Sequence, residues 1–216
     1  MKQRIWFIGG GLALLVAAAL WWFGGDALGL LRFKQQFAAA ATERAREPAL
    51  ALADACVPCH GVNGNSIADS YPPLAGQSVV YLSAQLTQFA AGQRHAPAME
   101  SMARSLSTRD RDLLIQWFAR QTPTVVRIDR LPETLRSCAA CHGDHLEGRT
   151  APIAAPRLAG LGKTYVTAQL LAFRTGKRGA ADGLMNTIAR PLSDDAIAGL
   201  SEAIASARRQ ARANAK

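Results

Sequence analysis

Apolar residues recur along most of this chain at the three- and four-residue spacing of an α-helix. Beyond the N-terminal region this spacing predicts six helices, over residues 49–59, 78–91, 107–121, 131–141, 163–175 and 193 to about 211. The third carries an apolar stripe that should face a core, formed by Leu113, Leu114, Trp117 and Phe118. Ser107 followed by Asp110 predicts a capping box at its start, and Ser193 predicts a serine cap on the last helix. Runs typical of strands are scarce, so the pattern predicts an all-α protein.

The N-terminal region contains an uncharged apolar run over residues 5–23. As a helix this run would span roughly 28 Å, which is enough to cross a bilayer. Tryptophans lie near both of its ends, at Trp6, Trp21 and Trp22. Because the run exceeds the usual apolar region of an export signal, we predict a retained single transmembrane helix. The alternative is a cleaved signal peptide, since Lys2 and Arg4 precede the run.

Composition and charge narrow the class of protein. The chain has 216 residues, 19% of them charged and 6% aromatic, which fits helical globular domains better than a disordered or disulfide-stapled chain. The net charge of +9 is uneven: residues 1–30 contribute +1, 31–47 contribute +2, 48–124 contribute 0 and 125–216 contribute +6. No basic stripe is interleaved with aromatic residues, which argues against nucleic acid. An acidic protein surface or anionic lipid is the expected partner.

All four cysteines fall within two copies of the motif C-x-x-C-H, namely Cys56, Cys59, His60 and Cys138, Cys141, His142. This is the attachment signature of c-type haem. Two thiols three positions apart on one helical turn can both form thioethers with one porphyrin, and the adjacent histidine then lies beneath the iron. A four-cysteine zinc site would leave both histidines unexplained, and no βαβ pattern supports a thioredoxin-like site. We therefore predict two covalently bound haems c.

The two halves of the chain repeat one another. The Pro-x-Leu-Ala-Gly turns at Pro72 and Pro156 lie 84 residues apart. The same offset holds for the pairs Tyr81 and Tyr165, Gln85 and Gln169, Phe89 and Phe173, and Arg94 and Arg178. The pattern indicates a duplicated domain. We predict a transmembrane anchor in residues 1–30, a mostly helical spacer in 31–47, and haem domains in 48–124 and 125–216.

Each iron needs a sixth ligand, for which methionine is the usual choice in electron-transferring cytochromes c. Met185 is the single methionine of the second domain, and the repeat selects Met99 over Met102 in the first. Both are predicted to lie in loops after the second helix of their domain. The alternative is that each fills a gap in the core. His95 and His145 have no counterpart in the other half and are predicted at the surface.

These motifs resemble the dihaem class I cytochromes c of the c-four type over about residues 50–207. The resemblance rests on the paired C-x-x-C-H motifs, each followed by glycine, the Pro-x-Leu-Ala-Gly turns, the Tyr-x-x-x-Gln-Leu helices and the late methionines. It implies two tandem class I cytochrome c domains that carry electrons in the periplasm from a quinol-oxidising complex to a terminal oxidase. The predicted anchor departs from the simple export signal of many members. It places the chain in the bacterial inner membrane, with the haem domains in the periplasm.

The expected axial ligands are His60 and Met99 for the first haem and His142 and Met185 for the second. With no open coordination position, the protein is expected to be an electron carrier that works by outer-sphere transfer, and not an enzyme. One rival is a fixed electron-transfer subunit of an oxidase or dehydrogenase complex. The other is a dihaem peroxidase-like enzyme with one open haem. Arg94 and Arg178 are expected either to bind haem propionates or to be solvated, and the basic tail at Arg208, Arg209, Arg212 and Lys216 is expected to be a solvated helix end.

Overall fold

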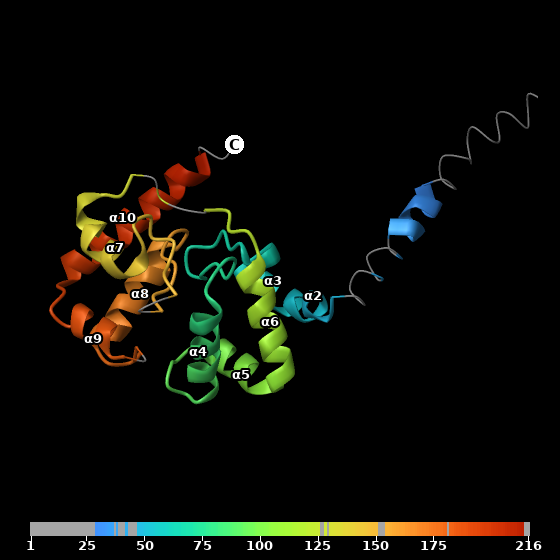
Figure 1. Ribbon diagram of the computed structural model, residues 1–216, viewed down its shortest axis with the longest axis horizontal. Helices are drawn as coiled ribbons and strands as arrows, with labels where there is room; N and C mark the ends of the chain where they lie inside the picture. The colour runs from blue at the N-terminus through green and yellow to red at the C-terminus, as the bar shows by residue number, and fades with distance from the viewer. Residues whose placement is uncertain are drawn as a thin grey trace, which may run out of the picture. The chain divides into compact units, whose positions relative to one another are not determined.

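The computed structural model describes residues 29–36, 38, 42, 47–125, 128, 130–150, 154–180 and 182–213, without the side chains of 207 and 210–213. The chain divides into two compact units, Met1–Pro48 and Ala49–Lys216, and Figure 1 shows their helices. Residues 29–36 of the first unit are helical. The predicted membrane-spanning run, residues 5–23, lies outside the described residues. Across the described ranges, no helix combines the length and apolar character that crossing a bilayer requires.

The first haem domain packs three longer helices around a small core. Its elements are α2 (Pro48–Ala53), a 3-10 turn (Asp54–Cys56), α3 (Val57–His60), α4 (Val79–Ala90), α5 (Pro97–Ser105) and α6 (Thr108–Arg120). Helix α4 packs against both α5 and α6. The buried side chains at the centre are Ala53, Leu82, Leu114, Ile115 and Phe118. The apolar stripe predicted for α6 therefore does face the core, because Leu114 and Phe118 are buried.

The second haem domain repeats this arrangement. Its elements are a 3-10 turn (Glu133–Leu135), α7 (Arg136–His142), α8 (Lys163–Arg174), α9 (Leu184–Ala189) and α10 (Asp194–Ala213). Helix α8 packs against α9 and α10. The core includes Leu135, Leu146, Val166 and Ile204. It also includes Val125 and Ile128 of the connector, which is the segment between the end of α6 and this 3-10 turn. The connector is therefore anchored in the second domain.

Most predicted helices are found, and the differences are local. Both serine caps are confirmed, because Asp110 N donates to Ser107 Oγ and Ala196 N donates to Ser193 Oγ, each at 3.1 Å. The first predicted helix is broken by a 3-10 turn before α3. The loops predicted around the two methionines are instead the short helices α5 and α9, so that part of the prediction was wrong.

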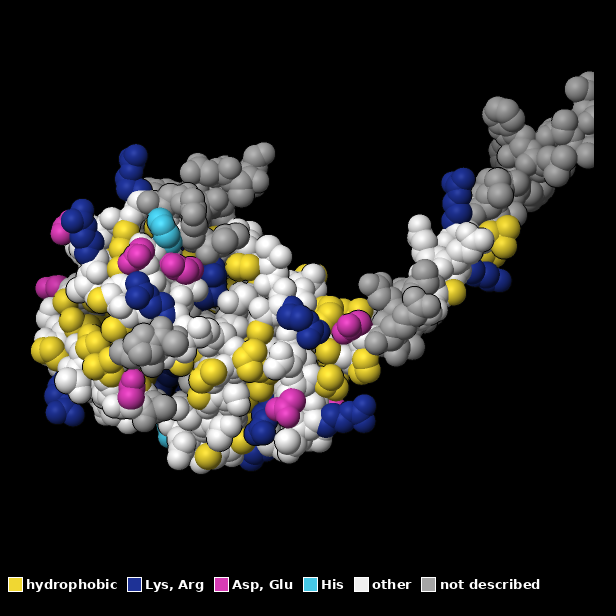
Figure 2. Space-filling view, viewed as in Figure 1, with side chains coloured by type: hydrophobic (Ala, Val, Ile, Leu, Met, Phe, Trp, Pro, Cys, Tyr) yellow, Lys and Arg dark blue, Asp and Glu magenta, His cyan; other side chains and the backbone are white. Residues whose placement is uncertain are grey.

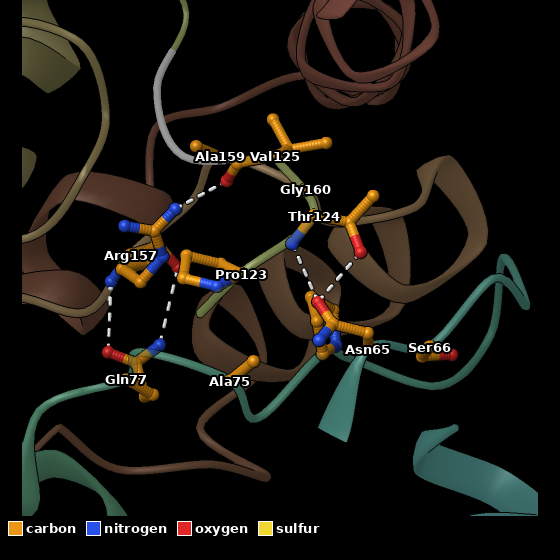
Figure 3. A pocket seen from close by; sticks show the side chains of 11 residues that line it. Asn65, Ser66, Ala75, Gln77, Pro123, Thr124, Val125, Arg157, Ala159 and Gly160 are labelled. Atoms are coloured by element: carbon orange, nitrogen blue, oxygen red, sulfur yellow. Dashed lines mark hydrogen bonds between the residues drawn. The ribbon is translucent and has the colours of Figure 1, made fainter. Parts of the chain in front are cut away.

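The two haem domains form direct polar contacts beside the connector (Figure 3). Gln77 of the first domain accepts a hydrogen bond from Arg157 N at 3.1 Å and donates one to Arg157 O at 3.4 Å. Asn65 Oδ1 accepts from the backbone N–H and the hydroxyl of Thr124, at 2.7 and 2.9 Å. The Arg157 side chain donates to the carbonyl of Val125 at 2.6 Å. These bonds tie the start of the connector to both domains.

Candidate haem sites

The first C-x-x-C-H motif begins at Cys56, the last residue of the 3-10 turn, and its other residues make up the short helix α3, Val57–His60. Pro58 lies in its first turn, where a missing N–H costs nothing, and Gly61 ends it with φ of 77°. A Cβ at Gly61 would lie 2.5 Å from the carbonyl oxygen of Asn65, so only glycine fits this turn. The chain therefore leaves the motif sharply, which brings the following loop back beside His60.

The second motif ends α7 in the same way. Gly143 follows His142 with φ of 90°, and a Cβ there would meet the carboxyl group of Glu147 at 2.6 Å. Cys138 and Cys141 lie on the last turns of α7, and none of the four described cysteines is in a disulfide. Burial raises the pKa of the Cys56 and Cys138 thiols. Each domain thus places two cysteines three residues apart and outside any disulfide, the arrangement that thioether attachment needs.

Both motif histidines are held in one orientation by a backbone carbonyl. His60 Nδ1 donates to the carbonyl oxygen of Pro72, and His142 Nδ1 donates to that of Pro156, each at 2.8 Å. A carbonyl only accepts, so the proton must be on Nδ1, and Nε2 is then the nitrogen that can bind iron. Burial lowers the pKa of both rings, which keeps them neutral. Each imidazole is therefore prepared as a metal ligand.

The two predicted methionine ligands lie at equivalent places. Met99 is in the first turn of α5, which packs against α4, and Met185 is in the first turn of α9, which packs against α8. Both side chains are partly buried. Met102 lies one turn further along α5. The ligation of iron by Met99 and Met185 stays a prediction.

The other two histidines differ from each other. His95 is exposed, with 68% of its side chain accessible, as predicted. His145 is only half-exposed, and its Nδ1 donates to the carbonyl of Ile128 at 3.0 Å. The surface position predicted for His145 is therefore only partly right, because this ring helps to hold the connector.

Arg94 and Arg178 are buried between the two domains. They form an isolated antiparallel bridge with one another, and only 7% and 5% of their surfaces are exposed. Arg94 donates to Gln85, Tyr165 and Gln169. Arg178 donates to Gln169, Tyr81 and Gln85. Each guanidinium also lies over a phenylalanine of its own domain, 4.5 and 4.4 Å from the ring centre. We call these six polar side chains the interdomain network.

The interdomain network corrects and extends the sequence prediction. The solvated alternative for Arg94 and Arg178 was wrong, because both are buried. The sequence marked the partner tyrosines and glutamines only as repeated positions. Their common offset of 84 residues indicated that the two copies share a role, but not that this role is contact between the domains.

Two buried donors, one beside the first motif and one between the domains, suit the carboxylates of haem. Trp117 Nε1 and Arg178 Nε are buried, and the described part of the chain offers neither of them an acceptor. Trp117 packs against the core of the first domain together with Cys56. A buried donor without an acceptor costs free energy, which an anionic group would recover. Together with the cysteine pairs and neutral imidazoles, these donors fit haem c.

Two thiol pairs, two oriented imidazoles and an all-helical core in each half define a dihaem c-type cytochrome. The sequence profile of the cytochrome c family matches residues 48–117 and 133–207. The chain is 35% identical over 175 residues to cytochrome c4 of Azotobacter vinelandii, covering 69% of this chain and 82% of that protein. It is 31% identical over 201 residues to the thiosulfate dehydrogenase electron acceptor of Stutzerimonas stutzeri (strain A1501), covering 84% and 92%.

A solved structure agrees with these matches. Reduced recombinant cytochrome c4 from Pseudomonas stutzeri gives a TM-score of 0.66 at 30% identity, covering 74% of this chain and 96% of that chain. The chain therefore belongs to the cytochrome c family, as a cytochrome c4-like dihaem electron-transfer protein. It binds two haems c covalently, one through Cys56 and Cys59 and one through Cys138 and Cys141.

Proposed function

We propose that this protein carries electrons in the periplasm from a quinol-oxidising cytochrome bc-type complex to a terminal oxidase. The observation that carries the proposal is the pair of equivalent haem sites in two domains joined by the buried interdomain network. A carrier with two redox centres needs both haem domains to stay together in one stable structure. The buried arginines and the glutamines that they share hold the two domains in contact. When bound, each haem supplies a one-electron centre.

The residues of the chain fill both axial positions of each iron in this proposal. His60 and Met99 are the ligands in the first domain, and His142 and Met185 are those in the second. With both positions filled, no substrate reaches the iron, and the protein acts as a carrier and not as an enzyme. Methionine raises the reduction potential, and the hydrogen bond from Nδ1 to a carbonyl lowers it by making the imidazole a stronger donor.

The interdomain network also holds the haem carboxylates in this proposal. Arg94 and Arg178 place two cations between the domains, and Trp117 adds a neutral donor in the first domain. Within the described residues, no acidic side chain is paired with either arginine. Two buried cations favour nearby anions, so these residues would orient the propionates and remove the cost of burying the charges.

We further propose that residues 5–23 anchor the chain in the bacterial inner membrane, with the haem domains in the periplasm. The support is the length of the uncharged run and the tryptophans near its ends. An anchored carrier searches a thin layer beside the membrane, which raises its effective concentration for membrane-bound partners.

A second candidate function is that of an electron acceptor for a dehydrogenase. The match to the thiosulfate dehydrogenase electron acceptor covers 84% of this chain, against 69% for the cytochrome c4 of Azotobacter vinelandii. In that case the chain would receive electrons from a soluble or bound dehydrogenase, and the anchor would hold the pair at the membrane. The haem sites and their ligands would be the same.

The test begins with the full-length protein extracted from membranes. Haem quantitation, optical and electron paramagnetic resonance spectra and a carbon monoxide challenge should give two low-spin haems per chain that do not bind carbon monoxide. A high-spin or carbon monoxide-reactive haem would instead favour a dihaem peroxidase-like enzyme. Reduction rates with a quinol-oxidising complex and with a thiosulfate dehydrogenase then separate the two carrier functions. Faster reduction by the dehydrogenase would overturn the first in favour of the second.

A further inference from the structure

The loop that orients His60 is held by the other haem domain. Residues 61–71 connect His60 to Pro72, whose carbonyl oxygen accepts the hydrogen bond from His60 Nδ1 at 2.8 Å. We call residues 61–72 the proximal loop of domain 1. Three of its residues, Ser66, Ala68 and Asp69, are bonded to helices α8 and α10 of the second domain.

Asp69 caps helix α8 from the first domain. Its Oδ1 accepts from the N–H of Lys163 at 2.8 Å, and its Oδ2 accepts from the N–H and hydroxyl of Thr164 at 2.7 and 2.6 Å. Its carbonyl oxygen accepts from Tyr165 N at 3.1 Å. The residue before the helix, Gly162, makes no side-chain cap, and a Cβ there would collide with Asp69. Helix α4 of the first domain differs, because its own Ser78 caps it.

Arg208 holds the same loop from helix α10. Its side chain, 5% exposed, donates to the carbonyl of Ser66 at 3.1 Å and to that of Ala68 at 3.5 Å. The Ser66 hydroxyl in turn donates to the carbonyl of Cys59 at 3.4 Å. A chain of contacts thus runs from α10 to the helix that carries the first haem motif. The solvated helix end predicted for this part of the tail was wrong for Arg208.

We infer that Asp69 and Arg208 are positioning residues for the haem of domain 1, and that they lower its reduction potential by keeping Pro72 O bonded to His60 Nδ1. The inference rests on the proposed ligation of that haem by His60. A carbonyl that accepts from Nδ1 raises the basicity of the imidazole. A stronger electron donor stabilises the oxidised iron. Loosening the loop weakens the bond from Nδ1, so the potential rises.

The second domain has its own support from the first. Pro156, which accepts from His142 Nδ1, is followed by Arg157, and both backbone groups of Arg157 are bonded to Gln77 of domain 1. Figure 3 shows the two bonds between Gln77 and Arg157. Each domain therefore holds the segment that orients the histidine of the other. Replacing Gln77 should act on the second haem, and replacing Asp69 or Arg208 on the first.

The test replaces two residues of opposite charge, with Asp69→Ala and Arg208→Met, in the full-length protein with both haems. The two reduction potentials are measured by spectroelectrochemical titration and assigned by the paramagnetically shifted resonances of each haem. Both substitutions should raise the potential of the first haem. The expected rise is up to about tenfold in its reduction equilibrium constant, which is about 59 mV for one electron. Charge alone predicts opposite signs, since losing a cation lowers the potential and losing an anion raises it.

Arg209→Met is the matched control for Arg208→Met. Arg209 is the next residue on α10 and is exposed, and it pairs with Glu202 of its own helix at 2.6 Å. Its loss removes the same charge without touching the loop. Gln77→Leu, which changes no charge, should raise the potential of the second haem and leave the first in place.

The result that overturns the inference is a first-haem potential that falls in Arg208→Met, or that changes only as much as in Arg209→Met. Optical spectra of each variant keep this outcome separate from a failure of the proposed function. If the unsubstituted protein lacks two low-spin haems with histidine and methionine ligands, the proposed ligation has failed. If it has them and the variants do not shift as stated, only the positioning role has failed. Faster hydrogen exchange at His60 Nδ1 in Asp69→Ala and Arg208→Met is the second expected signature.

Discussion

The two haem domains share one backbone arrangement behind their motifs but fill it with different side chains. Gly64 and Leu146 occupy the same place in the repeat, and the carbonyl of each accepts two backbone hydrogen bonds from the Pro-x-Leu-Ala-Gly turn. Both have a positive φ, 74° and 57°. A Cβ at Gly64 would lie 2.8 Å from Phe118, whereas Leu146 is fully buried in a cluster with Ile204. Ile204 is the counterpart of Phe118, because each lies eleven residues after the serine that caps its helix, Ser193 or Ser107.

This difference shows how a duplicated site tolerates change. In the first domain a large phenylalanine fills the core and the loop must be glycine. In the second a smaller isoleucine leaves room for leucine, whose burial offsets the strain of a positive φ. The surfaces beside the two haem motifs also differ. Val62 and Ile67 are 69% and 83% exposed beside the first motif, whereas the loop after the second motif carries Asp144, Glu147 and Arg149. The groups that would bind haem stay the same while their surroundings change.

The largest expected effect comes from removing one axial ligand at a time. Met99→Leu and Met185→Leu should each make one haem per chain reactive to carbon monoxide and remove about half of the far-red methionine–iron absorbance, because leucine offers no lone pair to iron. Carbon monoxide titration with optical detection measures both. Met102→Leu is the control and should leave two unreactive haems. An unreactive Met99→Leu protein would show that another group ligates the first iron.

The packing difference between Gly64 and Leu146 can be tested by a substitution in the second domain. Leu146→Ala should cost about 3 kcal/mol of the free energy of unfolding, since it empties a fully buried position and leaves a residue with positive φ. Chemical denaturation of the protein with both haems measures the cost. Gly64→Ala should also destabilise, through its clash with Phe118 and its positive φ. If Leu146→Ala cost less than about 1 kcal/mol, the packing argument would not hold.

Removing either arginine of the interdomain network should destabilise the protein by the same amount. Arg94→Met and Arg178→Met should each cost about 2 kcal/mol, because each removes three hydrogen bonds from a buried guanidinium. The double variant should cost less than the sum, since both arginines share Gln85 and Gln169. Denaturation measures all three variants. Arg104→Met, an exposed arginine paired with Glu100 one turn away, should change stability by less than about 0.5 kcal/mol.

Acid should loosen the cap of α8 before that of α4. Hydrogen bonds from Thr164 and Lys163 hold the pKa of Asp69 below its usual value. Its contribution to stability is therefore complete above the unfolded pKa of about 3.9 and is lost as the pH falls through the lower folded value. Hydrogen exchange at Thr164 N between pH 5 and pH 2 should accelerate relative to Tyr81 N, which Ser78 caps without a titrating group. Asp69→Asn should remove most of this pH dependence, and its persistence would point to another acid.

The smallest effect concerns charge. Residues 125–216 carry a net +6 and residues 48–124 carry none. Figure 2 shows the described Lys and Arg side chains of one face scattered among acidic ones, with no continuous stripe. Lys177→Glu in the second domain should slow reaction with an acidic redox partner by about twofold at low salt, and more than Arg104→Glu in the first. Stopped-flow rates at several ionic strengths measure the effect. Equal slowing in both variants would remove the distinction between the domains.

The helices and the haem motifs could be predicted from sequence because their signals are local. Ser107 and Ser193 cap their own helices, and the thiols lie three residues apart. Helices α5 and α9 were missed because they are short and begin beside Pro97 and Gly183, which are ordinary loop signals. The contacts between the domains could not be predicted. Arg208 is one of several arginines in a basic tail, and nothing local distinguishes the one that reaches Ser66.

The interdomain network is reciprocal, and this bears on how the two domains associate. Arg94 contacts Tyr165 and Arg178 contacts Tyr81, so each contact has its counterpart with the two halves exchanged. Self-complementary exchange of this kind is what an isologous homodimer with a two-fold axis requires. A single domain with this face would pair with a second copy of itself. In this chain the connector makes the pairing intramolecular, so that its population does not depend on concentration. The two halves, expressed as separate chains with their haems, should therefore reassociate in solution.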